Sequence, residues 1–289
     1  MCKLKSAIIL KDRVFIPDYD SHSDMLVELD IEDTKANAER LFVRAELSPK
    51  DGDAFAPVDD WVFKVDQDIR PEWFVESYEE GRMREAVKEW AKEHIHIGVN
   101  GLKISSGSNH YIKDCKDVEI CGSATVKNIY DSATVENICG RATVKNIYDS
   151  ATVKNIYDSA TVENIYGRAT VKNICDSATV ENIYGRATVE NIYGRATVKN
   201  IYGRATVEYI YGSATVENIY GRATVKNIYG SATVEYIYDS ATVIGSPFGW
   251  NNKDKFIISD NATFKDNQAK IIYQAGDWEI RLVDKEKNK

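Results

Sequence analysis

A run of near-identical nine-residue units fills the middle of the chain and constrains its fold more than any other feature. Thirteen units follow one another from Ser123 to Asp239, with the consensus Ser/Arg-Ala-Thr-Val-Lys/Glu-Asn-Ile-Tyr-Asp/Gly, and a partial unit, Ser240–Val243, closes the array. A unit this short cannot bury its own apolar residues, whereas stacked units bury them together. The sequence therefore predicts a mainly β fold, a β-solenoid of parallel stacked coils.

Each unit is predicted to be one short strand followed by a turn. Thr, Val, Ile and Tyr favour extended backbone, while the Asp-Ser, Gly-Arg and Gly-Ser pairs between the strands suit tight turns. We expect the Ala, Val and Ile of each unit, such as Ala124, Val126 and Ile129, to point inward, and Thr, Lys/Glu and Tyr to point outward. Asn128 and its equivalents are expected to line a turn, where stacked amides can hydrogen-bond along the axis.

The number of residues per coil is 18 or 27, because two or three units can make one turn of the solenoid. Cysteine replaces tyrosine at three positions separated by 18 and 36 residues, which are Cys121, Cys139 and Cys175. One set of arginines recurs every 18 residues, namely Arg168, Arg186, Arg204 and Arg222. Another recurs every 27 residues, namely Arg141, Arg168, Arg195 and Arg222. The small alanines suit a thin core between two sheets and favour 18, but both values stay open.

The segments that flank the repeats differ from them in kind. We expect a small α/β N-terminal domain in residues 1–100, irregular first rungs in 101–122, the solenoid in 123–243 and a C-terminal β cap in 244–289. A cap would keep other chains away from the open strand groups at the solenoid's end.

Within the N-terminal domain, apolar runs predict three strands and apolar spacing predicts one long helix. The strands are Ala7–Phe15, Leu41–Leu47 and Trp61–Val65, and the helix is Glu76–His94, with Met83, Val87 and Trp90 along one stripe. Ser23 is expected to cap a further short helix.

The distribution of charge argues against several functions. Residues 1–100 carry 14 Lys and Arg against 23 Asp and Glu, whereas the repeats 123–239 carry 12 of each sign. A nucleic-acid binder needs a basic face, and a DNA mimic would need an acidic repeat body, so neither is expected.

The compartment is predicted from apolar runs and cysteines. No run of about 18 apolar residues occurs, so we expect no membrane span, and Ala7–Leu10 is too short for the core of a signal peptide. The five cysteines are odd in number and form no Cys-x-x-Cys pair, which fits free thiols in a reducing compartment. We therefore expect a cytoplasmic protein.

Several segments resemble short-repeat β-solenoid proteins of gut bacteria and their phages. They are KSAIILKDRVFIPDYDSHSDML, VDQDIRPEWF, AVKEWAKEH and the array ATVKNIYDSATVEN, which together span most of the chain. The resemblance implies a source and a phage-related role, either as a virion component or as an inhibitor of a host protein. It implies no established activity.

Residues that could carry chemistry are few. His94 and His96, with His110 later, could hold a metal, but a surface histidine pair is the more ordinary interpretation. Asp66, Asp68 and Glu72 could act as paired carboxylates, although the segment around them is rich in solvated charge. We expect no enzyme, no metal and no cofactor; an enzyme in the N-terminal domain, with the repeats as a spacer, stays open as an alternative.

Two other repeat functions are tested by the pattern within the unit. Calcium-binding rolls of nine residues need a Gly-Gly-x-Gly-x-Asp cluster, which is absent here. Ice-binding solenoids present flat Thr-x-Thr faces, whereas the residue after Thr125 and Val126 is the charged Lys127. Ice binding therefore stays a minor alternative.

The tyrosine column is the most informative surface that the sequence predicts. If the side chains point outward they form an aromatic ladder, and tyrosine is common in recognition surfaces. Stacking that only stabilises the solenoid is the competing interpretation. We predict a structural or interaction protein, whose ladder serves protein binding or self-association, a homodimer being one open possibility. The predicted binding residues are Tyr130, Tyr148, Tyr166, Tyr184, Tyr202, Tyr220 and Tyr238.

Overall fold

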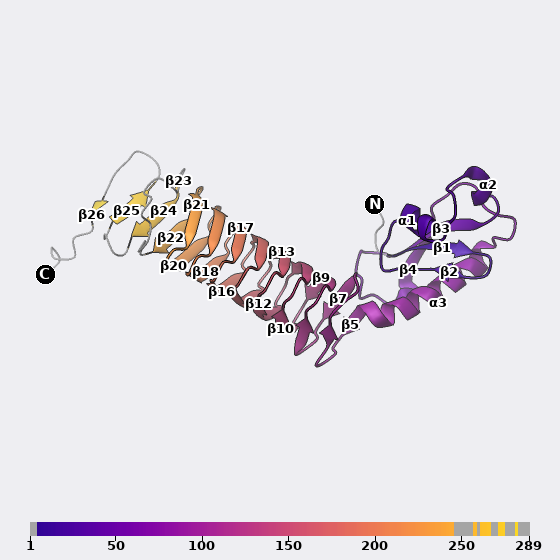
Figure 1. The fold of residues 1–289 in the computed structure, drawn as a ribbon, viewed down its shortest axis with the longest axis horizontal. Coiled ribbons are helices and arrows are strands. Elements are labelled where there is room, and N and C mark those ends of the chain that lie inside the picture. The colour runs from indigo at the N-terminus through magenta and orange to yellow at the C-terminus, as the bar shows by residue number, and fades with distance from the viewer. Residues whose placement is uncertain (1–4, 246–256, 259–260, 267–270, 275–280, 283–289) are drawn as a thin grey trace. The chain divides into compact units, whose positions relative to one another are not determined.

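A computed structural model describes residues 5–245, 257–258, 261–266, 271–274 and 281–282 of the chain (Figure 1). It divides into two compact units, each treated by itself below. The first comprises residues 1–97 and 108–111, and the second comprises residues 98–107 and 112–289.

The N-terminal unit is built on an antiparallel sheet in the order β2-β1-β3-β4. Its strands are β1 (Lys5–Leu10), β2 (Val14–Phe15), β3 (Phe42–Pro49) and β4 (Trp61–Val65). The single strand expected over Ala7–Phe15 is wrong, because the polar residues 11–13 form a tight turn in which Leu10 N donates to Arg13 O at 2.8 Å. The segment is thus a hairpin, β1 paired with β2.

Each face of this sheet buries a separate apolar cluster, because side chains alternate along a strand. On one face, Ile9 and Val43 pack with Met83 and Val87 of α3 (Glu76–His94), whose bounds are those predicted. On the other face lie Ile8 and Phe42, covered by two short helices. These are α1 (His22–Glu28) and α2 (Lys35–Ala38); a short 3-10 helix, η1 (Val58–Asp60), precedes β4.

The cap of α1 is two residues earlier than predicted. Ser21, and not Ser23, is the N-cap, since its hydroxyl accepts a hydrogen bond from Asp24 N at 3.3 Å. Ser23 already lies within the helix. The correction places His22 in the first turn of α1.

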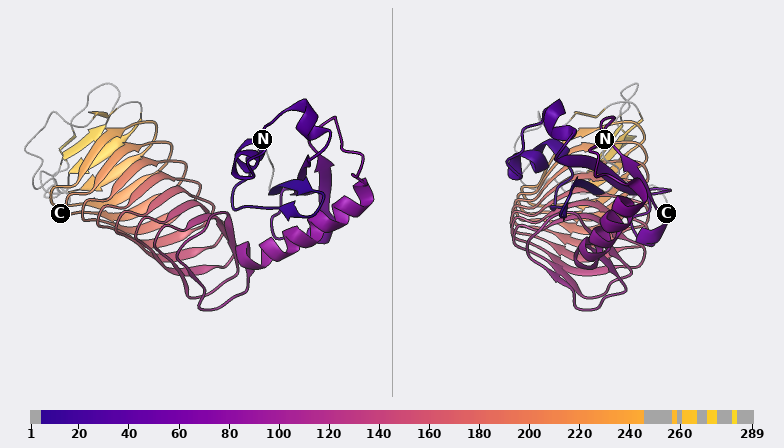
Figure 2. Two further views of the ribbon diagram at one scale, coloured as in Figure 1. Left: turned by 45° about the vertical axis from the view of Figure 1, so that its right-hand side comes forward. Right: turned by 90° about the vertical axis from the view of Figure 1, so that its right-hand side faces the viewer.

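The repeats form a β-solenoid with 18 residues per coil. Strands two units apart pair in parallel with like residues opposite, as in Thr134↔Thr152 and Val135↔Val153, so that successive coils stack in register (Figure 2). This register excludes 27. The repeat strands are β9 (Thr125–Tyr130), β10 (Thr134–Ile138), β11 (Thr143–Ile147), β12 (Thr152–Ile156), β13 (Thr161–Ile165), β14 (Thr170–Ile174), β15 (Thr179–Ile183), β16 (Thr188–Ile192), β17 (Thr197–Ile201), β18 (Thr206–Ile210), β19 (Thr215–Ile219), β20 (Thr224–Ile228) and β21 (Thr233–Ile237).

Even-numbered and odd-numbered repeat strands belong to two different sheets that enclose the core. One sheet has the order β26-β25-β24-β22-β20-β18-β16-β14-β12-β10-β8-β6, and the other has the order β23-β21-β19-β17-β15-β13-β11-β9-β7-β5. The remaining strands are β5 (Ile95–Ile97), β6 (Lys103–Ile104), β7 (His110–Lys113), β8 (Val118–Ile120), β22 (Thr242–Gly245), β23 (Ile257–Ile258), β24 (Thr263–Asp266), β25 (Ile271–Gln274) and β26 (Arg281–Leu282).

The solenoid core consists of the three apolar residues predicted to point inward. Ala124, Val126 and Ile129 are 0% exposed, and their equivalents in the other units are buried in the same way. Two residues separate the inward Val from the inward Ile, so side chains do not alternate strictly between the two faces of the strand. The irregularity lies at the Lys/Glu position, which is absent from the register of paired residues. Asn128 therefore lies inside β9, and the prediction that it lines a turn is wrong.

The ninth residue of each unit makes the turn in left-handed backbone, with φ of 57° at Asp149 and 71° at Gly167. Only Gly, Asp and Asn adopt this conformation readily, which explains the Asp/Gly restriction. A Cβ on Gly167 would come within 2.7 Å of Asp149 N in the neighbouring coil. The close stacking of the turns thus adds a steric reason for glycine.

The C-terminal cap predicted in 244–289 lies largely outside the described residues. Its described strands extend both sheets of the solenoid, because β23 pairs in parallel with β21. β24 pairs with β22 in parallel, and β25 and β26 then add antiparallel strands.

Candidate functional site

All seven predicted tyrosines lie in one column along one edge of the solenoid, one in each coil. Their rings follow one another at centroid distances of 4.6 to 5.0 Å. From Tyr148 to Tyr238 the interplanar angles are 1° to 9°, so these rings are stacked, while Tyr130 is tilted by 49° against Tyr148. We call this column the tyrosine ladder; the 18-residue coil produces it.

The ladder presents ring edges and hydroxyl groups, because neighbouring rings cover one another's faces. The rings are half-buried, and burial is the main cause that raises the pKa of Tyr166, Tyr184, Tyr202 and Tyr220. For Tyr130 the first cause is the charge of Asp131. These phenols stay protonated at neutral pH and can donate hydrogen bonds.

A row of arginines accompanies the ladder on the same edge. Four consecutive coils place an exposed Arg two residues after the ladder tyrosine, and no ion pair involves these four side chains within the described residues. Each follows a glycine, so its own turn carries no carboxylate. We call this set the arginine row: Arg168, Arg186, Arg204 and Arg222.

In the described column of turns beside the arginine row, acidic residues occur only at the two ends of the row. Asp149 precedes it in the column of turns, and Asp239 follows it, where its Oδ2 accepts from Gly221 N at 3.0 Å. A surface hollow near the first end is lined by Asp149, Ser150, Gly167, Arg168 and Arg186. The middle of the edge is therefore positive over four coils.

The opposite edge carries both features only in part, since among its tyrosines Tyr193 and Tyr211 stack, at 5.0 Å. Its column at the tyrosine position contains Cys121, Cys139 and Cys175, and its two arginines, Arg141 and Arg195, lie three coils apart. The opposite edge thus has a shorter tyrosine stack and separated arginines at the same positions of the unit, which gives an internal control.

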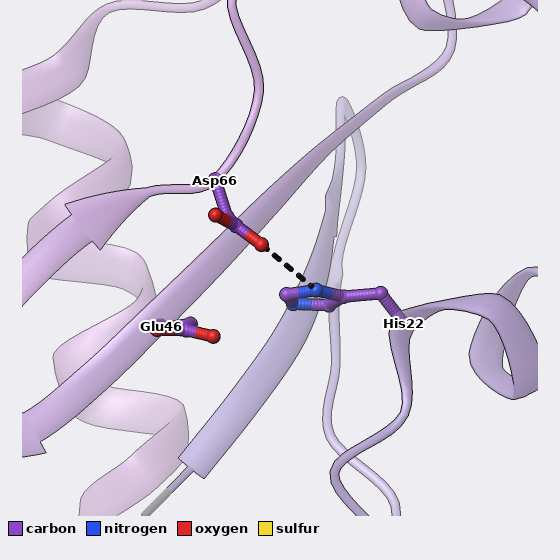
Figure 3. Close-up of side chains that lie close together, drawn as sticks. All are labelled: His22, Glu46 and Asp66. Atoms are coloured by element: carbon purple, nitrogen blue, oxygen red, sulfur yellow. Dashed lines mark ion pairs between the residues drawn. The ribbon is translucent and has the colours of Figure 1, made fainter. Parts of the chain in front are cut away.

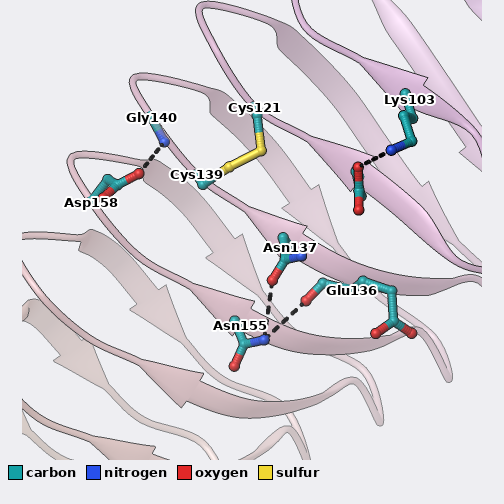
Figure 4. Close-up of a disulfide and its surroundings, with 9 residues drawn as sticks. Lys103, Cys121, Glu136, Asn137, Cys139, Gly140, Asn155 and Asp158 are labelled. Atoms are coloured by element: carbon teal, nitrogen blue, oxygen red, sulfur yellow. Dashed lines mark hydrogen bonds and ion pairs between the residues drawn. A yellow bond between two sulfur atoms is a disulfide. The ribbon is translucent and has the colours of Figure 1, made fainter.

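Two of the cysteines on the opposite edge form a disulfide. Cys121 and Cys139 are bonded, with their Cα atoms 4.5 Å apart (Figure 4). The expectation of free thiols is therefore wrong for this pair, because the 18-residue coil stacks the two positions directly. Cys115 and Cys175 are free and buried, and Cys2 lies outside the described residues.

Asparagine amides link the coils on both sheets, as the repeat pattern predicts. On one sheet Nδ2 of each Asn donates to Oδ1 of the Asn one coil before, at 3.0 to 3.1 Å, from Asn218 back to Asn128. On the other sheet the run extends from Asn191 to Asn137, and Figure 4 shows its first step at Asn155. Tyr209 interrupts this second run.

The three histidines considered for a metal form a ring stack in the N-terminal unit. His94 stacks between Trp90 and His110, at centroid distances of 4.4 and 5.0 Å, and His96 stacks on His110 at 5.6 Å. Both ring nitrogens of His94 are engaged, Nδ1 with Trp90 O at 2.7 Å and Nε2 with Asp18 Oδ1 at 3.0 Å. The three histidines therefore do not converge on one ion.

A different group does converge in the same unit. Atoms of His22, Glu46 and Asp66 that could bind a metal lie within 4.8 Å of one another (Figure 3). Asp66 was considered in the sequence only beside Asp68 and Glu72. No spacing in the sequence indicates the group, since the three residues come from α1, β3 and the end of β4.

Comparison with protein-family models, with curated proteins and with solved structures found no match. Among the described residues, no helix is long and apolar enough to cross a membrane. The function is therefore inferred from the chain's own residues.

Proposed function

We propose that the chain is a structural or interaction protein whose solenoid holds an acidic protein surface along the tyrosine ladder and the arginine row. The surface belongs to a partner protein or to a second copy of the chain. The observation that carries this proposal is the run of four exposed, unpaired arginines beside a continuous stack of tyrosines.

The spacing of the edge supports an extended contact. Tyrosine rings repeat every 4.8 to 5.0 Å from Tyr148 to Tyr238, and the strands beneath them are fixed by in-register pairing. Side chains on such a scaffold lose little further freedom on binding, which favours affinity. Guanidinium groups bind carboxylates through paired hydrogen bonds, and protonated phenols add further donors.

The orientation of the rings argues for a protein partner over single-stranded nucleic acid. Proteins that bind single strands stack bases on open aromatic faces. Within the ladder, Tyr166, Tyr184 and Tyr202 use both faces on their neighbours. A partner is therefore recognised by its carboxylates and shape, and not by flat rings.

Two sets of variants test this proposal with the two edges as each other's control. One replaces the four arginines of the arginine row by Gln; the other replaces Arg141 and Arg195, which occupy the same position of the unit on the opposite edge. Light scattering coupled to size-exclusion chromatography over a wide concentration range measures self-association, and quantitative affinity capture measures partners.

We expect association of the wild type to weaken with added salt, to be lost in the arginine-row variant and to persist in the opposite-edge variant. Circular dichroism checks that both variants keep their strands. Two results would contradict the proposal. One is a monomeric wild type that captures the same proteins as the arginine-row variant; the other is association that persists in both variants.

A further inference from the structure

A polar strip crosses the face of the N-terminal sheet that α1 covers. Ser6 of β1 is paired with Glu46 of β3, and Glu46 with Lys64 of β4. Paired residues of antiparallel strands point to the same face, and Asp66, two residues after Lys64, continues the strip. His22 projects onto the strip from the first turn of α1 (Figure 3).

The ring of His22 is held in the orientation that a metal ligand needs. Its Nε2 lies 3.2 Å from Ala45 O, and a carbonyl oxygen can only accept, so Nε2 carries the proton. Nδ1 is then left with its lone pair, 3.7 Å from Asp66 Oδ2. A backbone carbonyl behind the ring is the usual partner of a metal-binding histidine, because it fixes the tautomer and the ring plane.

We propose that His22 Nδ1, Glu46 and Asp66 bind a divalent transition-metal ion, with Zn²⁺ the best match. One imidazole and two carboxylates suit zinc, and their two negative charges balance the ion. In a tetrahedral site with bonds of about 2.0–2.2 Å, ligand atoms lie roughly 3.4 Å apart. The three atoms lie within 4.8 Å of one another, so closing the site requires side-chain movements of about an ångström. Asp66 is exposed and Glu46 half-buried, so both can move.

A second observation points to a ligand at the same place. Ser6 is 0% exposed, and its hydroxyl has no hydrogen-bond partner among the described residues. Buried hydroxyls are nearly always paired, and an unpaired one calls for a water, an ion or another group. Since Ser6 lies opposite Glu46 in the sheet, its hydroxyl is placed to donate to that carboxylate or to a water on the ion.

Lys64 competes with the ion for one ligand. Its Nζ lies 3.4 Å from Asp66 Oδ1, at the rim of the strip, while Oδ2 faces His22. Removal of this positive charge should therefore tighten the binding of a cation. That direction is specific to the proposed site, because Lys64 is exposed and its side chain pairs only with Asp66 among the described residues.

The test is isothermal titration of Zn²⁺ into the chelator-treated full-length protein, with Co²⁺ absorption as a second probe of an imidazole and carboxylate set. We expect one Zn²⁺ per chain. Glu46→Gln and Asp66→Asn should weaken binding at least tenfold, and Lys64→Ala should tighten it severalfold. Asp68→Asn, an exposed neighbouring carboxylate, should leave binding unchanged.

Three results would overturn the proposal. They are no binding of Zn²⁺ by the wild type, equal binding by Glu46→Gln, Asp66→Asn and Asp68→Asn, and loss of binding in His96→Gln, which would place the ion at the histidine stack. His22→Gln removes the imidazole while keeping a polar side chain of similar length. If it unfolds, the carboxylate variants still decide.

Discussion

At the scale of single residues, His96 is expected to make the N-terminal unit less stable in acid. Burial, and then the neighbouring His110 and His94, lower the pKa of His96 to about 4. In the unfolded chain the ring takes up a proton near pH 6.5, whereas the folded ring does not until about pH 4. The unfolded state therefore binds more protons in this window, and stability falls as the pH falls through it.

We expect His96→Gln to flatten this part of the pH profile. Between pH 7 and pH 4.5, the free energy of unfolding of the variant should fall by on the order of 1 kcal/mol less than that of the wild type. This difference is smaller than the full pKa shift implies, because solvent partly screens the half-buried ring. Urea unfolding followed by tryptophan fluorescence at several pH values measures the difference. Parallel profiles for the two proteins would show that His96 titrates normally.

Residue positions were predictable where the repeat determines them and unpredictable elsewhere. The sequence puts Cys121 and Cys139 in one column if the coil has 18 residues, but only the register places their Cα atoms 4.5 Å apart. His22, Glu46 and Asp66 meet through the pairing of strands far apart in the chain, and no periodic signal reports that pairing.

At the scale of elements, the asparagine runs hold adjacent coils together. Asn182 donates to Asn164 Oδ1 at 3.1 Å and accepts from Asn200 Nδ2 at 3.0 Å. Asn227 has no asparagine in the coil before it and donates only to Glu208 O, at 3.1 Å. The two positions therefore separate the effect of the run from the effect of one amide.

We expect Asn182→Ala to destabilise the solenoid by about 1–2 kcal/mol, because it leaves a donor and an acceptor of the run unpaired. Asn227→Ala should cost less than half of that. Thermal unfolding by circular dichroism, with hydrogen exchange on the coils beside each site, provides the comparison. Equal losses of stability in the two variants would mean that an amide inside the asparagine run contributes no more than an isolated one.

Strand and helix bounds followed from the sequence where one apolar period dominates. The helix over Glu76–His94 keeps a single stripe throughout, and its bounds were predicted. The hairpin at residues 5–15 was missed because a short polar turn lies inside an otherwise continuous apolar run. Asn128 was placed in a turn because a nine-residue period hides the extra outward residue between Val126 and Ile129.

At the scale of the whole molecule, the 18-residue register makes the solenoid divisible in pairs of units. Deletion of residues 186–203 removes one full coil and should rejoin like residues, since Thr170↔Thr188 and Thr188↔Thr206 pair in the same way. We expect the variant to keep its strand signal per residue and to unfold near the temperature of the wild type. An unfolded product would contradict the register.

The core and the surface of the solenoid thus repeat with different periods. Ala, Val and Ile recur in every unit, whereas the tyrosine ladder and the arginine row recur only in every second one. Insertion or loss of one unit would leave the interior filled and yet exchange the two edges downstream. Loss of one unit between Arg168 and Arg195 would bring these two arginines into adjacent coils of one edge and carry Arg204 and Arg222 to the opposite edge. The gain or loss of a single repeat can therefore change which residues each edge presents, while the packing of the core is kept.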